Sequence, residues 1–179
     1  MEIENHCHIC KNKSEQTLCK NCYVQLFAPV EKHVSFAFLT DIPEEIDHES
    51  LKDSIVLDYF GSNLVKAEIT DFSQLRQLRL SHCKKLTRIE LTNLPNLISL
   101  DSFYCKRVSE VIFTNTPNLV ALDLSYCPRL EKIQGDFPKV EYFSISHTNI
   151  SQIPNLPSAK YVDISSTKIT DITAISKFT

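Results

Sequence analysis

Glycine and tryptophan are the residues that this sequence most conspicuously lacks: it contains two glycines and no tryptophan in 179 residues. Glycine allows tight turns and close approach of the backbone to a phosphate, so its scarcity excludes glycine-rich phosphate loops and a Rossmann-type nucleotide site. A surplus of basic charge is also missing, because 19 Lys and Arg face 22 Asp and Glu, for a formal net charge of -3. This balance argues against a general nucleic-acid-binding protein and leaves room only for a local basic patch.

Long apolar segments and a secretion signal are missing as well. No apolar run approaches the roughly 20 residues that a membrane-spanning helix needs. Residues Met1 to His6 are acidic and polar, where a secretion signal would be basic and then apolar. The seven cysteines are an odd number and four of them have metal-ligand spacing, so we do not expect disulfides. These features predict a soluble intracellular protein, in the cytoplasm or nucleus, in a reducing compartment and without membrane contact.

Four cysteines form two pairs near the N-terminus. Cys7 and Cys10 enclose two residues, eight residues follow, and Cys19 and Cys22 repeat the spacing. Two such pairs offer four thiolates to one tetrahedral Zn²⁺, in the closed arrangement of a structural site. A redox Cys-x2-Cys pair is the weaker interpretation, because no thioredoxin-like βαβ pattern surrounds it. We predict one structural zinc ion bound by these four cysteines in a small module of residues 1–33.

Neighbouring residues keep alternatives open for this module. His6 and His8 flank Cys7, and either could replace a cysteine as a ligand. The segment resembles a short zinc knuckle or ribbon, and LCKNCY is similar to pieces of B-box and MYND fingers, whose second metal site has no ligands here. It also distantly resembles the Ran-binding-protein finger, without the tryptophan of that family. Three lysines give the module a local basic character that suits either phosphate contact or a solvated face: Lys11, Lys13 and Lys20.

Residues 34–63 form a transition between the module and the rest of the chain. Phe36, Phe38 and Ile42 alternate as in a strand, and Pro43 then opens a polar stretch in which a short helix near 44–56 is expected. The segment 55–60 fits the pattern of the following residues poorly. We predict that residues 34–63 cap the first repeat of a solenoid, since an uncapped end leaves core side chains in water.

From residue 75 onward the sequence repeats itself. The blocks are LRQLRLSHCKKLTRIELTNLPN from Leu75, LISLDSFYCKRVSEVIFTNTPN from Leu97, LVALDLSYCPRLEKIQGDFPK from Leu119, VEYFSISHTNISQIPNLPS from Val140 and AKYVDISSTKITDITAISKF from Ala159. The first three begin 22 residues apart, and a weaker unit precedes them from about residue 64. One unit cannot bury its own leucines, so successive units must stack and share a core, with each LxxLxL segment as a strand of a parallel sheet. Residues 64–179 are therefore predicted to be a solenoid.

The pattern LxxLxLxxC/TxxL resembles the leucine-rich-repeat superfamily, and the period of 22 with the L-P-N-L junction resembles its 22-residue class. The LDLSYCPRLEKI wording is similar to repeats of plant resistance proteins. The resemblance implies a solenoid with a parallel β-sheet on its concave side and an irregular or 3₁₀ convex side. At the ninth position of each block, where that family usually has asparagine, the chain has small residues that can donate to turn carbonyls: Cys83, Cys105, Cys127, Thr148 and Thr167. We interpret the three cysteines as structural thiols.

The inferred register gives the concave face a distinctive set of side chains. The residues between the leucines point away from the core, and they combine aromatic rings with acidic groups. Aromatic side chains with one polar tip are enriched at protein interfaces, although stacking between neighbouring repeats is an alternative explanation. The candidate partner-binding residues are Arg79, His82, Asp101, Phe103, Tyr104, Asp123, Tyr126, Tyr142, His147, Tyr161 and Asp163.

A non-enzymatic adaptor or scaffold is the predicted function, with a protein or peptide ligand, preferably basic, on the concave face. Catalysis is not expected, because repeat periodicity explains the spacing of the Asp, His and Ser residues and no nucleophile elbow, P-loop or HExxH motif occurs. One alternative is a nucleic-acid-associated factor whose zinc module contacts RNA or DNA. A remote alternative is a ubiquitin-ligase component. The oligomeric state is left open.

Overall fold

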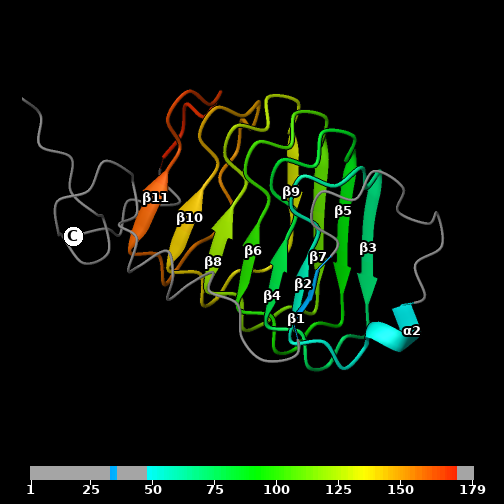
Figure 1. Cartoon of the computed structure of the whole chain (residues 1–179). Helices are drawn as coiled ribbons and strands as arrows, with labels where there is room; N and C mark the ends of the chain where they lie inside the picture. Colours follow the sequence, from blue (N-terminus) through cyan, green and yellow to red (C-terminus); the bar gives the residue numbers. More distant parts are fainter. Residues whose placement is uncertain (1–32, 36–47, 173–179) are drawn as a thin grey trace, which may run out of the picture.

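The computed structural model describes residues 33–35 and 48–172, and in it two parallel β-sheets run along a solenoid (Figure 1). The larger sheet has seven strands in the order β1-β2-β4-β6-β8-β10-β11. Their bounds are β1 His33–Ser35, β2 Val56–Asp58, β4 Gln77–Arg79, β6 Ser99–Asp101, β8 Ala121–Asp123, β10 Tyr142–Ser144 and β11 Tyr161–Asp163. One short helix, α2 His48–Leu51, precedes β2 and lies within the segment predicted to contain a helix.

A second parallel sheet forms the back of the solenoid. It has four strands in the order β3-β5-β7-β9: β3 Lys66–Thr70, β5 Arg88–Thr92, β7 Glu110–Thr114 and β9 Lys132–Gln134. The predicted irregular or 3₁₀ convex side is therefore wrong for this part of the chain. The physical reason is the alternation of the sequence: in β3, Ala67 and Ile69 are buried while Lys66, Glu68 and Thr70 are exposed.

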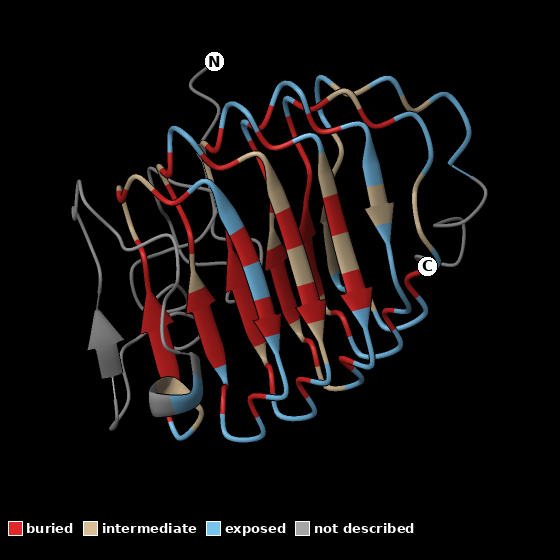
Figure 2. Cartoon of the chain, turned by 90° about the vertical axis from the view of Figure 1, so that its right-hand side faces the viewer, coloured by how far each residue is buried: buried red, intermediate tan, exposed pale blue. Residues whose placement is uncertain are grey.

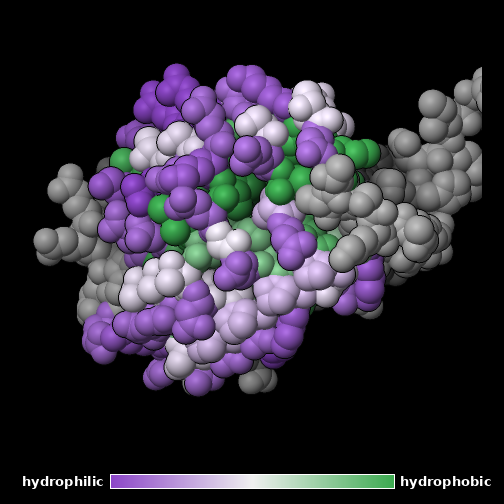
Figure 3. Space-filling model, turned by 180° about the vertical axis from the view of Figure 1, so that it is seen from behind, coloured by the Kyte–Doolittle hydropathy of each residue, from purple (hydrophilic) through white to green (hydrophobic). Residues whose placement is uncertain are grey.

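The outer face of this second sheet is charged and internally balanced. The guanidinium of Arg88 lies 3.1 Å from the carboxylate of Glu90 and 3.3 Å from that of Glu110, and the ammonium of Lys132 lies 3.0 Å from Glu110. In Figure 2, β3, β5 and β7 alternate between buried residues and residues that are exposed or of intermediate burial. Seen from behind, most of the visible surface is hydrophilic, with hydrophobic residues grouped near its middle (Figure 3).

The coils follow one another at about the predicted period. Leu78 pairs with Leu100 and Leu100 with Leu122, which is a step of 22 residues each time (100 − 78 and 122 − 100). The step from Leu57 to Leu78 is 21 residues (78 − 57), so β2 continues the same sheet on the N-terminal side of residue 64. The prediction of a repeat solenoid with a parallel sheet is confirmed.

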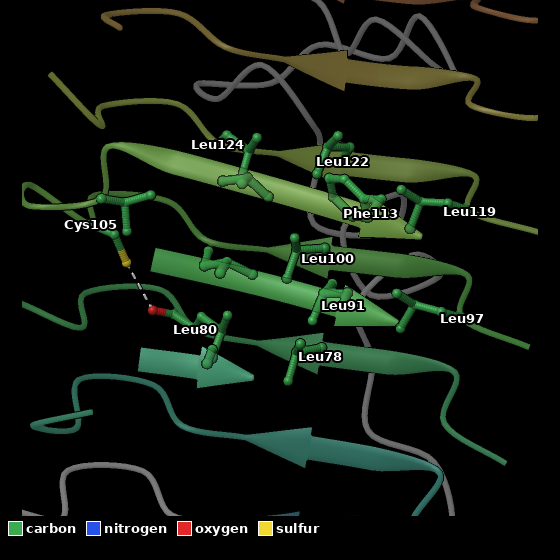
Figure 4. Close-up of a cluster of buried hydrophobic side chains, with 14 of the residues drawn as sticks. Leu78, Leu80, Leu91, Leu97, Leu100, Cys105, Phe113, Leu119, Leu122 and Leu124 are labelled. Atoms are coloured by element: carbon green, nitrogen blue, oxygen red, sulfur yellow. Dashed lines mark hydrogen bonds between the residues drawn. The ribbon is translucent and has the colours of Figure 1, made fainter. Parts of the chain in front are cut away.

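Leucine and other apolar side chains from both sheets fill the space between them. Leu78, Leu100 and Leu122 of the larger sheet are at most 1 % exposed, and Leu91 and Phe113 of the smaller sheet pack against the same cluster (Figure 4). Close packing of this kind is the main stabilising term of a solenoid, because no coil can bury its apolar residues alone.

Thiol groups close the turns that follow the larger sheet. The thiol of Cys83 donates to the carbonyl of Tyr59 at 3.0 Å, that of Cys105 to Leu80 at 3.0 Å and that of Cys127 to Ser102 at 3.3 Å. Each bond joins one coil to the coil before it. The hydroxyls of Thr148 and Thr167 donate instead within their own coils, to Ile145 and Ile164. The predicted donation to turn carbonyls is thus confirmed, and the three cysteines are buried free thiols.

Candidate binding face

Side chains on the outer face of the larger sheet stand in rows that cross the coils. In β4, β6 and β8 the middle residue is a core leucine, so the residue on either side of it faces outward. The residue after that leucine and its in-register equivalents form what we call the fifth-position row: Asp58, Arg79, Asp101, Asp123, Ser144 and Asp163. The row contains four carboxylates and one guanidinium.

Each aspartate of this row also has a structural role that the sequence reading missed. A carboxylate oxygen of Asp58 accepts the backbone N–H of Phe60 at 2.9 Å, and the same bond joins Asp123 to the N–H of Ser125 at 2.9 Å and Asp163 to that of Ser165 at 3.0 Å. Such Asx turns fix the backbone where a strand ends. The repeated Asp-x-Ser spacing in the last coils was the signal that could have revealed them.

Among the described residues, the charges of the fifth-position row are compensated at one end only. Arg79 lies between Asp58 and Asp101 in the sheet register, and its guanidinium is 3.5 Å from the carboxylate of Asp58. Within residues 48–172, no Lys, Arg or His forms an ion pair with Asp123 or Asp163. Burial, followed by repulsion from Asp101, raises the pKa of Asp123 to about 7. Within residues 48–172, the two carboxylates in the C-terminal half of the row, Asp123 and Asp163, therefore have no cationic partner.

Beyond the row, a line of rings follows the edge of the sheet at a left-handed position of the backbone. His82, Tyr104, Tyr126 and His147 have φ values of 62°, 61°, 57° and 56°. Apart from Gly, Asn, Asp and His, residues rarely adopt this conformation, which costs of order 1 kcal/mol or more, so Tyr104 and Tyr126 are the unfavourable members of the line. The turns after the smaller sheet have the expected residues at such positions: Asp71, Asn93 and Asn115. Backbone geometry alone thus gives no reason for rings at this edge.

These rings contact one another across successive coils. The centroids of Tyr126 and His147 are 4.3 Å apart in a stacked arrangement, and those of His82 and Tyr104 are 5.1 Å apart. Phe103, from the neighbouring position, lies 5.3 Å from Tyr126 and 5.5 Å from His82. Phe60 extends the line to the first coil, with its ring centroid 5.1 Å from that of His82. It was not predicted, because segment 55–60 fitted the repeat poorly. We call these six residues the aromatic edge.

Exposure differs along the aromatic edge. Tyr126 is 42 % exposed and His147 is also exposed, whereas the other four rings are half-buried. The ammonium of Lys106 lies over the Tyr104 ring, 4.4 Å from its centroid, which shows that a cation can be seated on this edge.

The remaining predicted face residues lie on the side of the sheet where the strands begin. Tyr142 and Tyr161 occupy paired positions of β10 and β11, and their rings stack with centroids 4.8 Å apart and an interplanar angle of 15°. Tyr142 is 4 % exposed and Tyr161 half-buried, while Asp101 is 6 % exposed. The structure thus brings all eleven predicted residues to one side of one sheet, and it buries two of them.

A groove lies on the side of the larger sheet where its strands begin. It has a volume of about 600 Å³ and is formed by side chains from several coils: Ile55, Gln74, Arg76, Asn96, Ile98, Asn118, Val120 and Lys139. No sequence motif indicated it, because its walls come from positions outside the repeated leucine pattern.

The predicted zinc ligands Cys7, Cys10, Cys19 and Cys22 lie outside the described residues. Within the part of the chain that the structure describes, no cluster of His, Cys, Asp and Glu has the composition and spacing to hold a metal ion. No helix of that part has the length and apolarity to cross a membrane.

No protein-family model, curated protein or solved structure matches the chain.

Proposed function

We propose that this chain is a non-enzymatic adaptor or scaffold of the leucine-rich-repeat type, and that it binds a basic protein segment on the outer face of its larger sheet. The aromatic edge is the observation that carries the proposal. Two of its residues, Tyr104 and Tyr126, occupy backbone positions that disfavour their side chains, and its exposed members lie near carboxylates that have no cationic partner within residues 48–172. Backbone strain that is maintained over several coils is typical of functional surfaces.

The chemistry of the face favours a cationic partner. Arg and Lys side chains are attracted by aromatic ring faces and by carboxylates, and both are offered here within neighbouring rows. The smaller sheet makes a useful contrast, since its charged residues Arg88, Glu110 and Lys132 already pair with one another. A basic segment therefore gains more favourable electrostatic contacts on the larger sheet than on the smaller sheet at the back of the solenoid.

Catalysis forms no part of the proposal. Asp123 and Asp163 accept backbone N–H groups of their own turns, so their spacing follows from the repeat. The hydroxyls of Ser125 and Ser165 donate to the same two carboxylates rather than to a histidine. A nucleophile activated by a base requires hydrogen bonds of a different kind.

Selection from a displayed library of random dodecapeptides tests the proposal. The unaltered protein is the target, and a Tyr126→Ser, His147→Ser double variant serves to remove peptides that bind elsewhere. We expect enrichment of peptides rich in Arg and Lys, with affinity at least about tenfold lower for the double variant, which corresponds to about 1.4 kcal/mol. The matched control is Val65→Ser, which removes another exposed apolar side chain from a different part of the surface.

The selection also has results that would count against the proposal. Peptides bound equally by the double variant, acidic peptides, or no enrichment at all would each contradict it. Selective retention of RNA or DNA by the full chain, lost on neutralising Lys11, Lys13 and Lys20, would favour the nucleic-acid alternative.

One structural zinc ion completes the proposal for the N-terminal module. Two Cys-x2-Cys pairs supply four thiolates, which is a donor set that suits tetrahedral Zn²⁺, and metal binding would supply folding free energy of order 10 kcal/mol. We expect one zinc ion per chain by elemental analysis after purification without chelator, and loss of that zinc in Cys10→Ser. Cys127→Ser, which changes a buried thiol of the solenoid, is the control that should keep its zinc. Retention of zinc by Cys10→Ser would overturn this assignment of the ligands.

A further inference from the structure

Two triplets of the fifth-position row have the same outer residues but different centres. Asp58, Arg79 and Asp101 occupy consecutive strands, with the guanidinium of the central residue beside a carboxylate. Asp123, Ser144 and Asp163 repeat this order on β8, β10 and β11. A small serine stands where the first triplet has its arginine. The first triplet therefore has a guanidinium that pairs with one of its two aspartates, Asp58, and the second triplet has the two aspartates without the cation.

Nothing in residues 48–172 neutralises this second triplet. Neither Asp123 nor Asp163 forms an ion pair there, and their carboxylates accept hydrogen bonds from the serines and backbone of their own turns. The titratable groups of the described residues that interact with Asp123 are Asp101, Asp163, Tyr142 and Cys127. The raised pKa of Asp123 has burial and Asp101 as its main causes, which is what an absent cation predicts.

The row next to the fifth-position row adds polar groups that lack partners. Gln77 and Ser99 occupy it on β4 and β6, and the same row continues to Tyr142 and Tyr161. The side-chain oxygens of Gln77 and Ser99 are buried without a hydrogen-bond partner, in residues that are 8 % and 0 % exposed. Ser99 faces the same side as Asp101 and lies diagonally from Asp123. Buried acceptors without donors are costly, so a ligand that brings donors recovers that cost.

We infer that the second triplet is a binding site, called here the arginine seat, for an arginine side chain of the bound partner. The guanidinium of that arginine would lie between Asp123 and Asp163, above Ser144. This rests on the proposed function, and it names the chemistry of the ligand. Arginine fits better than lysine because its planar group has five donors and can serve two carboxylates at once. The stacked rings of Tyr142 and Tyr161 form the adjoining wall, against which a guanidinium plane can lie.

A titration with small probes tests the inference directly. The full chain is titrated with N-acetyl-arginine amide and with N-acetyl-citrulline amide, which has nearly the same shape without the charge, while backbone amide signals are followed by NMR. We expect saturable shifts around Asp123, Ser144 and Asp163 with the arginine compound, and at least about tenfold weaker binding of the citrulline compound. Binding should also lower the pKa of Asp123 from about 7, measured on its carboxyl carbon.

Three variants sharpen the result. Asp123→Asn and Asp163→Asn should each weaken binding of the arginine probe by about fivefold or more, whereas Glu131→Gln, at an exposed acid outside the row, should not change it. Ser144→Arg fills the seat from within, as Arg79 does in the first triplet, and should abolish binding. If Ser144→Arg fails to fold, the two Asn variants still decide the matter.

The outcomes separate this inference from the proposed function. Equal binding of the arginine and citrulline probes, or shifts confined to another surface, would overturn the arginine seat. Library peptides that bind through Tyr126 and His147 while the arginine probe gives no shift would leave the adaptor function standing without the seat. Arginine binding without any enriched peptide would support the seat and count against a peptide-binding adaptor.

Discussion

Leu100→Ala is expected to lower the free energy of unfolding by about 3–4 kcal/mol, which is the largest effect that we predict for a single side chain of the solenoid. Leu100 is the middle residue of β6, is 0 % exposed, and pairs with Leu78 on one side and Leu122 on the other. Removing its side chain leaves a cavity between two sheets that share one core, and the adjoining coils cannot close it independently.

Urea unfolding followed by circular dichroism measures this effect. Val65→Ala is the control, because Val65 is 52 % exposed and its truncation should change the free energy of unfolding by less than about 0.5 kcal/mol. A loss below about 1 kcal/mol for Leu100→Ala would contradict a continuous core shared by the stacked coils.

Gly135→Ala should lower the free energy of unfolding by about 2–3 kcal/mol, mainly through the backbone. Gly135 has φ of 148°, a conformation that is nearly restricted to glycine, and an added Cβ would lie 2.8 Å from Cβ of Phe113. Phe113 is held in the core cluster and its ring packs edge-on against Phe137 at 5.2 Å, so it cannot move away cheaply.

The other glycine of the chain provides the matched control. Gly61 has φ of 66°, at the position that His82 and Tyr104 occupy in later coils, so Gly61→Asn should cost at most about 0.5 kcal/mol. Equal losses of thermal stability for Gly135→Ala and Gly61→Asn would show that the special geometry of Gly135 has no energetic consequence.

The sequence predicted the larger sheet because its leucines repeat with a fixed step, and Leu78, Leu100 and Leu122 are core residues in register. It did not predict the sheet at the back, since the family resemblance favoured an irregular convex side. The alternation of Lys66, Ala67, Glu68 and Ile69 was visible and is enough to explain β3. Segment 55–60 was underestimated because β2 joins β4 with a step of 21 rather than 22 residues.

The rows of the candidate face followed from the same register. Asp101 and Asp123 were predicted to stand in one row, as they do, because in-register parallel strands place equivalent residues side by side. The left-handed backbone at Tyr104 and Tyr126 could not be predicted, since these residue types disfavour it. The unpartnered oxygens of Gln77 and Ser99 were equally hidden, because hydrogen bonding depends on the side chains of adjoining coils.

Stacking between neighbouring coils is the competing explanation for the aromatic edge. Ring pairs such as Tyr126 and His147 at 4.3 Å stabilise a solenoid by about 0.5–1.5 kcal/mol beyond their buried area, without any partner. That gain is comparable to the cost of the left-handed backbone at each ring. Stability alone therefore does not require rings at this position, whereas the proposed binding of a cationic segment would use them.

Hydrogen–deuterium exchange of the full chain with and without an enriched basic peptide tests the central claim most directly. We predict protection from exchange in the turns and strand ends of the larger sheet, at residues 123–127 and 144–148, with the amides of β3, β5 and β7 unchanged. Protection confined to the smaller sheet, or to residues 1–33, would contradict binding on this face and assign the interaction to another part of the chain.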